Sequence, residues 1–473
     1  MNPPSAQSES AFISLPRAIL FAAGAILAFN LAYSIPQLSF LIVIYLACLF
    51  ELSRVKSGRQ AFYLGLLTAL GCYAPQTDFI WTIFGAAAIP LWLILAIWIA
   101  LFLVLTRLCR IRYGKLAAAL LAPFLWTGLE YFRSELYYLR FSWLNPGYSL
   151  SGQFHLLPFN VLGVYGIGFV LMAAISFAAL LSKTRRRIIF AVLLLLLAIN
   201  SNWLGRLDTP RSYHGNRLQI AGIQFEFPEE SEVVRCLDRL VKEYPDAQLL
   251  VLSEYTFAGP LPDRIKKWCA ANHRYLVIGA KDPVAGDEFY DTAFVIGPCG
   301  EIVFRQGKCV PIQFFKDGLP AREQKLWESP WGKIGFCICY DLSYTRVTDE
   351  LVRLGARAII VPTMDIVEWG RHQHEMHARV APIRSAEYGL PIFRLASSGI
   401  SQYVEPDGMV NSTAPMPGAA ATLFGNWPLD QTGTLPWDRR LAPVCVGITG
   451  LTAVWLLLCN FRKPGTLVQN PQS

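Results

Sequence analysis

The feature that most constrains this chain is a series of long apolar stretches. Seven of them precede residue 205 and an eighth follows a long polar segment; they run over about residues 17–34, 37–52, 61–75, 87–106, 116–132, 158–182, 187–203 and 441–460. Most approach the roughly 20 residues that a helix needs to cross a bilayer, although the second and third are short. Because 53% of the 473 residues are hydrophobic and only 16% are charged, the chain is predicted to be a membrane protein with about eight spanning helices.

Basic residues follow every second apolar stretch. They are Arg54, Lys56, Arg59, Arg107, Arg110, Arg112, Lys115, Lys183, Arg185, Arg186, Arg187, Arg462 and Lys463. The alternate loops, around 33–37 and 76–87, contain no Lys or Arg. The positive-inside rule therefore predicts that both termini are cytoplasmic and that the polar segment lies across the membrane. The basic loops explain most of the net charge of +8, so no nucleic-acid partner is predicted. Since further spans follow the first stretch, it is interpreted as a retained anchor and not as a cleaved signal.

These patterns divide the chain into five parts. Residues 1–16 form a polar tail, 17–204 a bundle of about seven membrane helices, 205–440 an extracytoplasmic domain, 441–461 a C-terminal membrane helix and 462–473 a cytoplasmic tail. Inside the polar domain, charged stretches with helical spacing separate short β-rich runs, which are Leu218–Ile223, Leu249–Ser253, Tyr275–Gly279, Ala293–Ile296, Ile302–Phe304, Ile334–Cys339, Ala358–Val361 and Ile392–Leu395. This alternation predicts a mixed α/β fold. The Gly-, Pro- and Thr-rich residues 405–436 are interpreted as an exit segment towards the last helix.

The cysteines and histidines of the polar domain do not have the spacing of a metal site. Its six cysteines include no C-x-x-C pair, and His372, His374 and His377 fit no zinc pattern. No metal and no cofactor are predicted, while a disulfide within the domain stays open.

One cysteine occupies a position suited to nucleophilic chemistry. Cys339 ends the run Ile334–Cys339 and is followed at once by Tyr340 and Asp341, so a strand is expected to lead into a sharp turn. Cys337, two residues earlier, should lie on the same strand face, and burial in the core is the alternative reading of either cysteine. A thiol with a pKa of about 8.5 needs a base and a positive neighbour to react at neutral pH.

Two upstream residues can supply these functions. Glu254 directly follows an apolar strand and would accept the thiol proton, although a surface or capping carboxylate is the plainer interpretation. Lys308 follows the run Ile302–Phe304 and would stabilise the thiolate and the oxyanion, together with the Tyr340 backbone N–H. Lys281, Lys316 and Lys333 compete for this role.

The order Glu254, Lys308, Cys339 resembles the catalytic triad of the nitrilase superfamily. Segments of the membrane half resemble one branch of that superfamily, the apolipoprotein N-acyltransferases: residues 125–133, 141–149 and 163–169. Residues 384–391 resemble the R-x-x-E-x-G-x-P element of the same family, and Trp369-Gly370 resembles its mobile tryptophan loop over the active site. The resemblance implies a four-layer αββα sandwich on a helical bundle, with Tyr340, Asp341, Trp369 and Glu387 as supporting residues.

The chain departs from the family pattern at one important place. The family usually has P-F-G-E after the catalytic lysine, which supplies a second glutamate, whereas this chain has Pro311-Ile312-Gln313-Phe314. Asp317 or Gln313 is the expected substitute. The family's C-Y-E becomes Cys339-Tyr340-Asp341, which is a conservative change.

The resemblance also implies a reaction and a location. An acyl chain would pass from a phospholipid, through a thioester on the cysteine, to the N-terminal amine of a diacylglyceryl-cysteine apolipoprotein. The protein would lie in the bacterial inner membrane with its catalytic domain in the periplasm. One alternative is a membrane-tethered amidase whose acyl-enzyme is released to water, and another is a degenerate domain that only binds.

Overall fold

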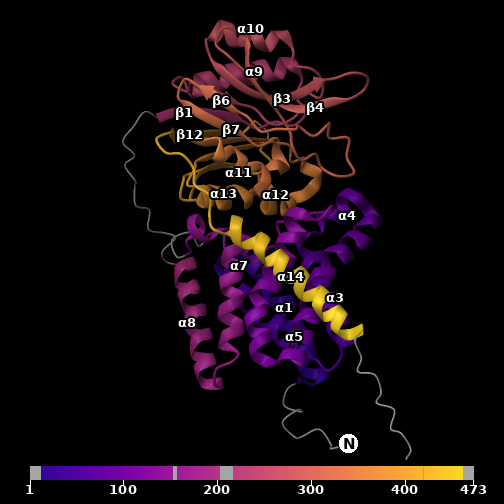
Figure 1. Ribbon diagram of the computed structural model, residues 1–473. Helices are drawn as coiled ribbons and strands as arrows, with labels where there is room; N and C mark the ends of the chain where they lie inside the picture. Colours follow the sequence, from indigo (N-terminus) through magenta and orange to yellow (C-terminus); the bar gives the residue numbers. More distant parts are fainter. Residues whose placement is uncertain (1–11, 153–156, 203–216, 419, 462–473) are drawn as a thin grey trace, which may run out of the picture.

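The computed structural model describes residues 12–152, 157–202, 217–418 and 420–461. Figure 1 shows two parts, a bundle of helices and a domain with two β-sheets seated on one end of it. The last helix, α14 (Asp438–Phe461), leaves the sheet domain and packs along the bundle.

The helical part follows the apolar stretches of the sequence. Its elements are α1 (Leu15–Ser34), η2 (Pro36–Leu41), α2 (Ile42–Leu52), α3 (Gly58–Gln76), α4 (Phe79–Phe84), η3 (Gly85–Ala87), α5 (Ala88–Tyr131), η4 (Phe132–Leu136), α6 (Pro146–Ser149), α7 (Phe159–Ala178) and α8 (Lys183–Asn202). The expected helices 87–106 and 116–132 both lie in α5, where they meet at Gly114 with a φ of 85°. Glycine accepts this left-handed conformation without a steric penalty, so the chain turns there with no loop.

Four described segments are long and apolar enough to cross a membrane: Leu15–Ser34, Phe79–Leu136, Phe159–Ala178 and Asp438–Cys459. The predicted helical region with apolar helices of membrane-spanning length is therefore confirmed, while the number of about eight spans and the bounds of the membrane region stay predictions.

The second part contains two mixed six-stranded sheets. The first has the order β12-β1-β2-β3-β4-β5 and the second the order β11-β10-β9-β8-β7-β6. In each sheet three central strands run parallel, β1 to β3 and β7 to β9, and the outer pairs are antiparallel. The bounds are β1 (Arg217–Ile223), β2 (Leu249–Val251), β3 (Tyr275–Pro283), β4 (Phe289–Ile296), β5 (Ile302–Gly307), β6 (Leu326–Ser329), β7 (Gly332–Phe336), β8 (Ala358–Thr363), β9 (Ile392–Ala396), β10 (Ser401–Val404), β11 (Val410–Ala414) and β12 (Thr422–Pro428).

The sheets face one another across an apolar core, and helices cover their outer faces. Ile220, Val251, Phe336 and Ile360 belong to the core between the sheets. The helices α9 (Glu230–Glu243) and α10 (Asp263–Asn272) cover the first sheet at the far end of the molecule (Figure 1). The helices α11 (Thr345–Arg353), α12 (Gly370–Ala378) and α13 (Val380–Tyr388) lie between the second sheet and the bundle. The predicted mixed α/β domain is confirmed.

The predicted exit segment 405–436 is wrong in part, because it contains β11 and β12. β12 pairs with β1 over seven residues, from Arg217↔Pro428 to Ile223↔Thr422. Gly425, Asn426 and Pro428, which are depleted in strands, interrupt its strand-forming residues, and the long-range pairing with β1 stabilises its extended conformation. β6 and β10 were also not predicted.

Buried polar contacts fix the sheet domain on the bundle. The Trp143 indole N–H donates to the Ser343 hydroxyl at 2.9 Å, and the Val164 amide donates to the Glu387 carboxylate at 2.7 Å. Trp143 lies in the segment between η4 and α6, and Ser343 lies four residues after Cys339. The turn that carries Cys339 is therefore held against the bundle.

Candidate active site

Cys339 lies on a strained turn at the end of β7. Its φ is 49°, in the left-handed region that residues with a Cβ atom rarely adopt. The 3₁₀ turn η6 (Cys339–Ser343) begins at this residue, and the thiol lies 3.8 Å from the Met364 carbonyl oxygen. Non-glycine residues in such conformations are concentrated at functional sites. The predicted strand-to-turn geometry is therefore present.

The expectation that Cys337 and Cys339 share one face is wrong. Cys337 packs in the cluster that contains Leu351 and Ile359, on the helix-covered side of the second sheet. Cys339 packs with Ile338 in the core between the sheets. The two-residue period of a strand holds only while the backbone is extended, and β7 ends at Phe336. The positive φ of Cys339 then directs its side chain to the other side.

Lys308 lies among three buried carboxylates. Its Nζ is 2.7 Å from Glu254 Oε1, 2.8 Å from Asp317 Oδ2 and 3.6 Å from Asp291 Oδ2. Lys308 and its partners are at most 8% exposed. Buried charges are stable only when they are paired and hydrogen-bonded, so this cluster forms a single electrostatic unit.

Burial and charge shift the ionisation of the cluster. Burial alone would lower the pKa of Lys308, but the carboxylates of Glu254 and Asp317 outweigh it and raise that pKa well above its usual value. Burial, together with the nearby Glu254 charge, raises the pKa of Asp291 well above its usual range. Burial and the Glu254 charge also raise the pKa of the Cys339 thiol, while Lys308 opposes this shift.

Glu254 is held by a tight local backbone. Its Oε2 accepts the Met364 amide at 2.6 Å, so the Met364 backbone contacts both Glu254 and the Cys339 thiol. The next residue, Tyr255, has a φ of 46°. β3 passes so close that a Cβ atom on Gly279 would lie 2.6 Å from the Glu254 Cα, which explains the glycine at that position.

The two candidates for the missing second glutamate lie in different places. Asp317 contacts Lys308, and it also accepts the Tyr255 hydroxyl at 3.1 Å and the Ile312 amide at 2.7 Å. The Gln313 side chain donates to the Tyr138 carbonyl oxygen of the bundle. Of the two, Asp317 has the contact with Lys308 that a second carboxylate would need.

We predict that Asp317→Asn slows the reaction of the Cys339 thiol with an acyl ester by about ten- to a hundredfold, because the substitution removes a charge that balances Lys308 while it keeps the side-chain shape. Gln313→Ala should stay close to the wild type, since Gln313 reaches the bundle and not the lysine. Single-turnover rates of adduct formation measure both effects, and equal rates for Asp317→Asn and wild type would remove Asp317 from the chemistry.

The other expected supporting residues lie around the turn and at the domain junction. The Asp341 carboxylate accepts the amides of Val310 at 2.7 Å and Ile338 at 3.2 Å, and so ties the Cys339 turn to the segment after Lys308. Burial raises the pKa of Asp341 to about 6. Glu387 does not contact the cluster around Lys308. It pairs with Arg384 at 2.6 Å and with Arg439 at 3.0 Å between α13 and α14.

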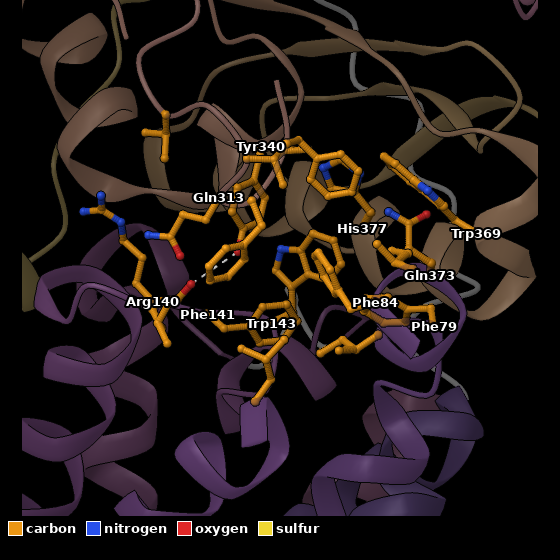
Figure 2. Close-up of a pocket in the computed structure, with 18 of the residues that line it drawn as sticks. Phe79, Phe84, Arg140, Phe141, Trp143, Gln313, Tyr340, Trp369, Gln373 and His377 are labelled. Carbon is orange, nitrogen blue, oxygen red and sulfur yellow. Dashed lines mark hydrogen bonds between the residues drawn. The ribbon is translucent and has the colours of Figure 1, made fainter. Parts of the chain in front are cut away.

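An apolar cavity of about 170 Å³ opens beside Cys339. Figure 2 shows Tyr340, His377 and Trp369 on the sheet-domain side and Phe79, Phe84 and Trp143 on the bundle side. The rings of Phe84 and Phe315 are 5.6 Å apart, and those of Phe315 and Trp369 are 6.3 Å apart. The cavity therefore joins the thiol to the end of the membrane bundle.

Sequence reasoning missed two groups of residues near the thiol. Asp291 lies inside β4, where one acidic residue in a strand gives little signal. Asp365 pairs with Arg394 at 2.5 Å and with His377 at 2.8 Å, and it closely follows the end of β8. Glu254 was selected because it directly follows an apolar strand, and the same criterion could have found Asp365.

Glu254, Asp291 and Asp317 also lie close enough to hold a metal ion, since their ligand oxygens are within 4.8 Å of one another. The Lys308 ammonium lies among these oxygens and supplies a positive charge. The three histidines of α12 have separate partners: His372 contacts Asp78 and Gln76, His374 contacts the Ile366 carbonyl and His377 contacts Asp365.

Two family models match most of the chain. Residues 23–177 match the apolipoprotein N-acyltransferase N-terminal domain, and residues 239–433 match the carbon-nitrogen hydrolase domain. The chain is 24% identical to an apolipoprotein N-acyltransferase of Geobacter metallireducens, over 76% of this chain and 80% of the relative. It is 25% identical to one from Ralstonia nicotianae, over 66% of each chain.

A formamidase of Bacillus cereus is 28% identical over 27% of this chain and 45% of its own. Among solved structures, a nitrilase-superfamily protein of Saccharomyces cerevisiae aligns with 45% of this chain and 90% of its own, at 18% identity and a TM-score of 0.38. A carbon-nitrogen hydrolase of Helicobacter pylori aligns with 53% of this chain and 97% of its own, at 17% identity and a TM-score of 0.40.

Proposed function

Because the chain belongs to the apolipoprotein N-acyltransferases, we propose that the protein transfers an acyl group and that Cys339 carries this group during the transfer. The observation that supports this most strongly is the position of Cys339, on a positive-φ turn between the Lys308 cluster and an apolar cavity that opens towards the bundle. The proposed donor is a phospholipid and the proposed acceptor is the N-terminal amine of a diacylglyceryl-cysteine apolipoprotein.

The first half-reaction forms a thioester and releases a lysophospholipid. Glu254 accepts the Cys339 proton while the sulfur attacks the carbonyl carbon of the acyl ester. Lys308 and the Tyr340 backbone N–H stabilise the negative oxygen of the tetrahedral intermediate. When the carbon–oxygen ester bond breaks, Glu254 returns the proton to the leaving alkoxide.

The second half-reaction reverses these proton movements. The neutral amine of the acceptor attacks the thioester carbon while Glu254 takes a proton from the amine nitrogen, and Glu254 returns this proton to the Cys339 sulfur when the carbon–sulfur bond breaks. The products are an amide and the free Cys339 thiol. Asp317 keeps Lys308 in place during both steps, and Asp341 holds the turn on which Cys339 lies.

The proposed architecture is a bundle of about eight membrane helices, including residues 17–204 and 441–461, and a four-layer αββα domain at 205–440 on the periplasmic side. Both substrates are anchored in the lipid. A site at the bilayer surface therefore raises their effective concentration. The apolar rings of Phe84 and Phe315 give the acyl chain a dry path to the thiol.

The orientation is tested with reporters in intact bacterial cells. We expect a reporter fused after residue 473 to be cytoplasmic and one inserted near Asp287 to be periplasmic, because the basic loops all follow the second, fourth, sixth and eighth stretches. Asp287 lies in an exposed turn between β3 and β4, where an insertion is tolerated. Labelling that places Asp287 inside the cell would overturn the orientation and the periplasmic acceptor with it.

The reaction is tested by mass spectrometry of the purified full-length protein after incubation with phospholipid. The expected result is one acyl adduct, located on Cys339, that disappears when a diacylglyceryl-cysteine peptide is added and reappears on the peptide amine. Adduct formation followed by release of free fatty acid, with no transfer to the amine, would instead indicate a hydrolase.

A further inference from the structure

A second, larger cavity lies at the opposite end of the helical bundle. Its volume is about 800 Å³, and it is bounded by the beginnings of α1 and α8 and the ends of α2 and α7. The turn between α7 and α8 lies at the end of the bundle away from the sheet domain (Figure 1). No residue that lines this cavity also lines the cavity beside Cys339. The two cavities are therefore separate sites.

The inner walls of this cavity are apolar. They include Phe21 from α1, Ile44 and Phe50 from α2, Ile175 from α7 and Phe190 from α8. A volume of several hundred cubic ångströms with such walls is typical of a pocket for an apolar ligand. The depth of the cavity is therefore suited to a hydrocarbon chain.

The rim of the cavity carries an excess of positive charge. Arg17, Arg54, Lys183 and Arg186 line it together with one carboxylate, Glu51, so four cations and one anion give a net charge of +3. Glu51 is 2.7 Å from Arg54 and 3.4 Å from Arg186. Within the described residues, no ion pair links Arg17 or Lys183 to a carboxylate. Two cations are thus available for an anionic ligand.

The backbone around the rim is preorganised for such a ligand. The Ile13 amide donates to the Arg54 carbonyl oxygen at 3.0 Å, which fixes the segment before α1 against the end of α2. Lys183 and Arg186 lie in the first turn of the 20-residue helix α8. The first turn of a helix carries the positive end of the helix dipole, which adds to the side-chain charges.

We propose that this cavity binds one anionic phospholipid, with its phosphate at the basic rim and an acyl chain against the apolar wall. Basic pockets between membrane helices, next to the bilayer surface, are suited to anionic head groups, and each lysine or arginine strengthens the attraction. An apolar wall next to a cationic rim matches a molecule that joins a phosphate to a hydrocarbon chain. The bound lipid would link α1, α2, α7 and α8, and it would take no part in acyl transfer.

The test measures lipid retention by the full-length protein in detergent, using native mass spectrometry and thermal melting. Phosphatidylglycerol, phosphatidylcholine and inorganic phosphate are compared on the wild type. The double variant Arg17→Gln/Lys183→Gln removes the two available cations. The control Arg59→Gln/Lys115→Gln removes the same charge from two exposed basic residues of α3 and α5 that do not line the cavity.

We expect phosphatidylglycerol to be retained and to raise the melting temperature of wild type and control, and both other ligands to have little effect. The cavity variant should bind phosphatidylglycerol at least tenfold more weakly, since each cation contributes about a factor of five to ten. Equal retention of phosphatidylcholine would overturn recognition of the anion, and an equal effect of inorganic phosphate would overturn the role of the acyl chain. An equal loss of phosphatidylglycerol binding in the cavity variant and in the control variant would indicate general charge attraction and would overturn the proposed site. Adduct formation on Cys339 should be retained in the cavity variant, so this result is independent of the proposed function.

Discussion

Replacing Cys339 by alanine is expected to abolish the acyl adduct and all transfer to the amine, while the protein still inserts in the membrane. The Cys339 thiolate is the only group of the protein that forms a bond to the acyl carbon in the proposed mechanism, and no described side chain of the Lys308 cluster can replace it. The substitution removes one sulfur atom from a site at the edge of a cavity, so the fold should survive. The measurement is mass spectrometry of the intact protein after incubation with phospholipid.

Cys337→Ala provides the matched control. Cys337 is fully buried on the other side of the second sheet, in the cluster that also contains Leu351 and Ile359, and burial raises the pKa of its thiol well above the usual value. The loss of one buried sulfur should cost about 1 kcal/mol of unfolding free energy and leave most activity. If the two variants had equal activity, Cys339 would not be the nucleophile.

Replacing Lys308 by methionine is expected to damage both stability and activity. The substitution preserves an unbranched side chain but leaves Glu254, Asp291 and Asp317 close together without their shared cation. Removal of one partner from a buried charge cluster costs about 3–5 kcal/mol of unfolding free energy. Loss of an oxyanion-stabilising group costs a further factor of about a hundred to a thousand in rate. Thermal melting in detergent and single-turnover adduct formation measure the two effects separately.

Lys316→Met is the control for this prediction. Lys316 lies in the same loop as Asp317, but its side chain is exposed and no contact with the buried carboxylates is present in the described residues. We expect its melting temperature and its rate of adduct formation to match the wild type. A Lys308→Met protein with wild-type melting behaviour would contradict the interpretation of Lys308 as the central charge of the cluster.

The sequence alone determined the parts of this protein that depend on local composition. Apolar runs of spanning length predict membrane helices, because a bilayer requires about 20 apolar residues irrespective of what surrounds them. The pattern of α9 is equally local: its buried residues Val233, Cys236, Leu237 and Leu240 recur at helical spacing. Glu254 and Lys308 each follow an apolar strand, and the resemblance to the nitrilase superfamily selected them as a pair, which the structure brings to 2.7 Å. In each case the signal lies within one segment of the chain.

Only the tertiary structure decided how distant segments meet. Asp317 and Gln313 were both candidates for the second carboxylate, and only the contact between Asp317 and Lys308 distinguished them. Asp291 lies in the cluster because β4 pairs with β5. The side to which Cys339 points depends on one positive φ angle, which the strand pattern of its neighbours could not predict. β12 is stabilised by its pairing with β1, which lies about 200 residues earlier in the chain. A partner at that separation leaves no pattern in the sequence of β12 itself. Contacts between remote segments determine these features. The free energy of a buried charge, or of a strand in a sheet, depends on the groups that it pairs with more than on the residues next to it in the chain.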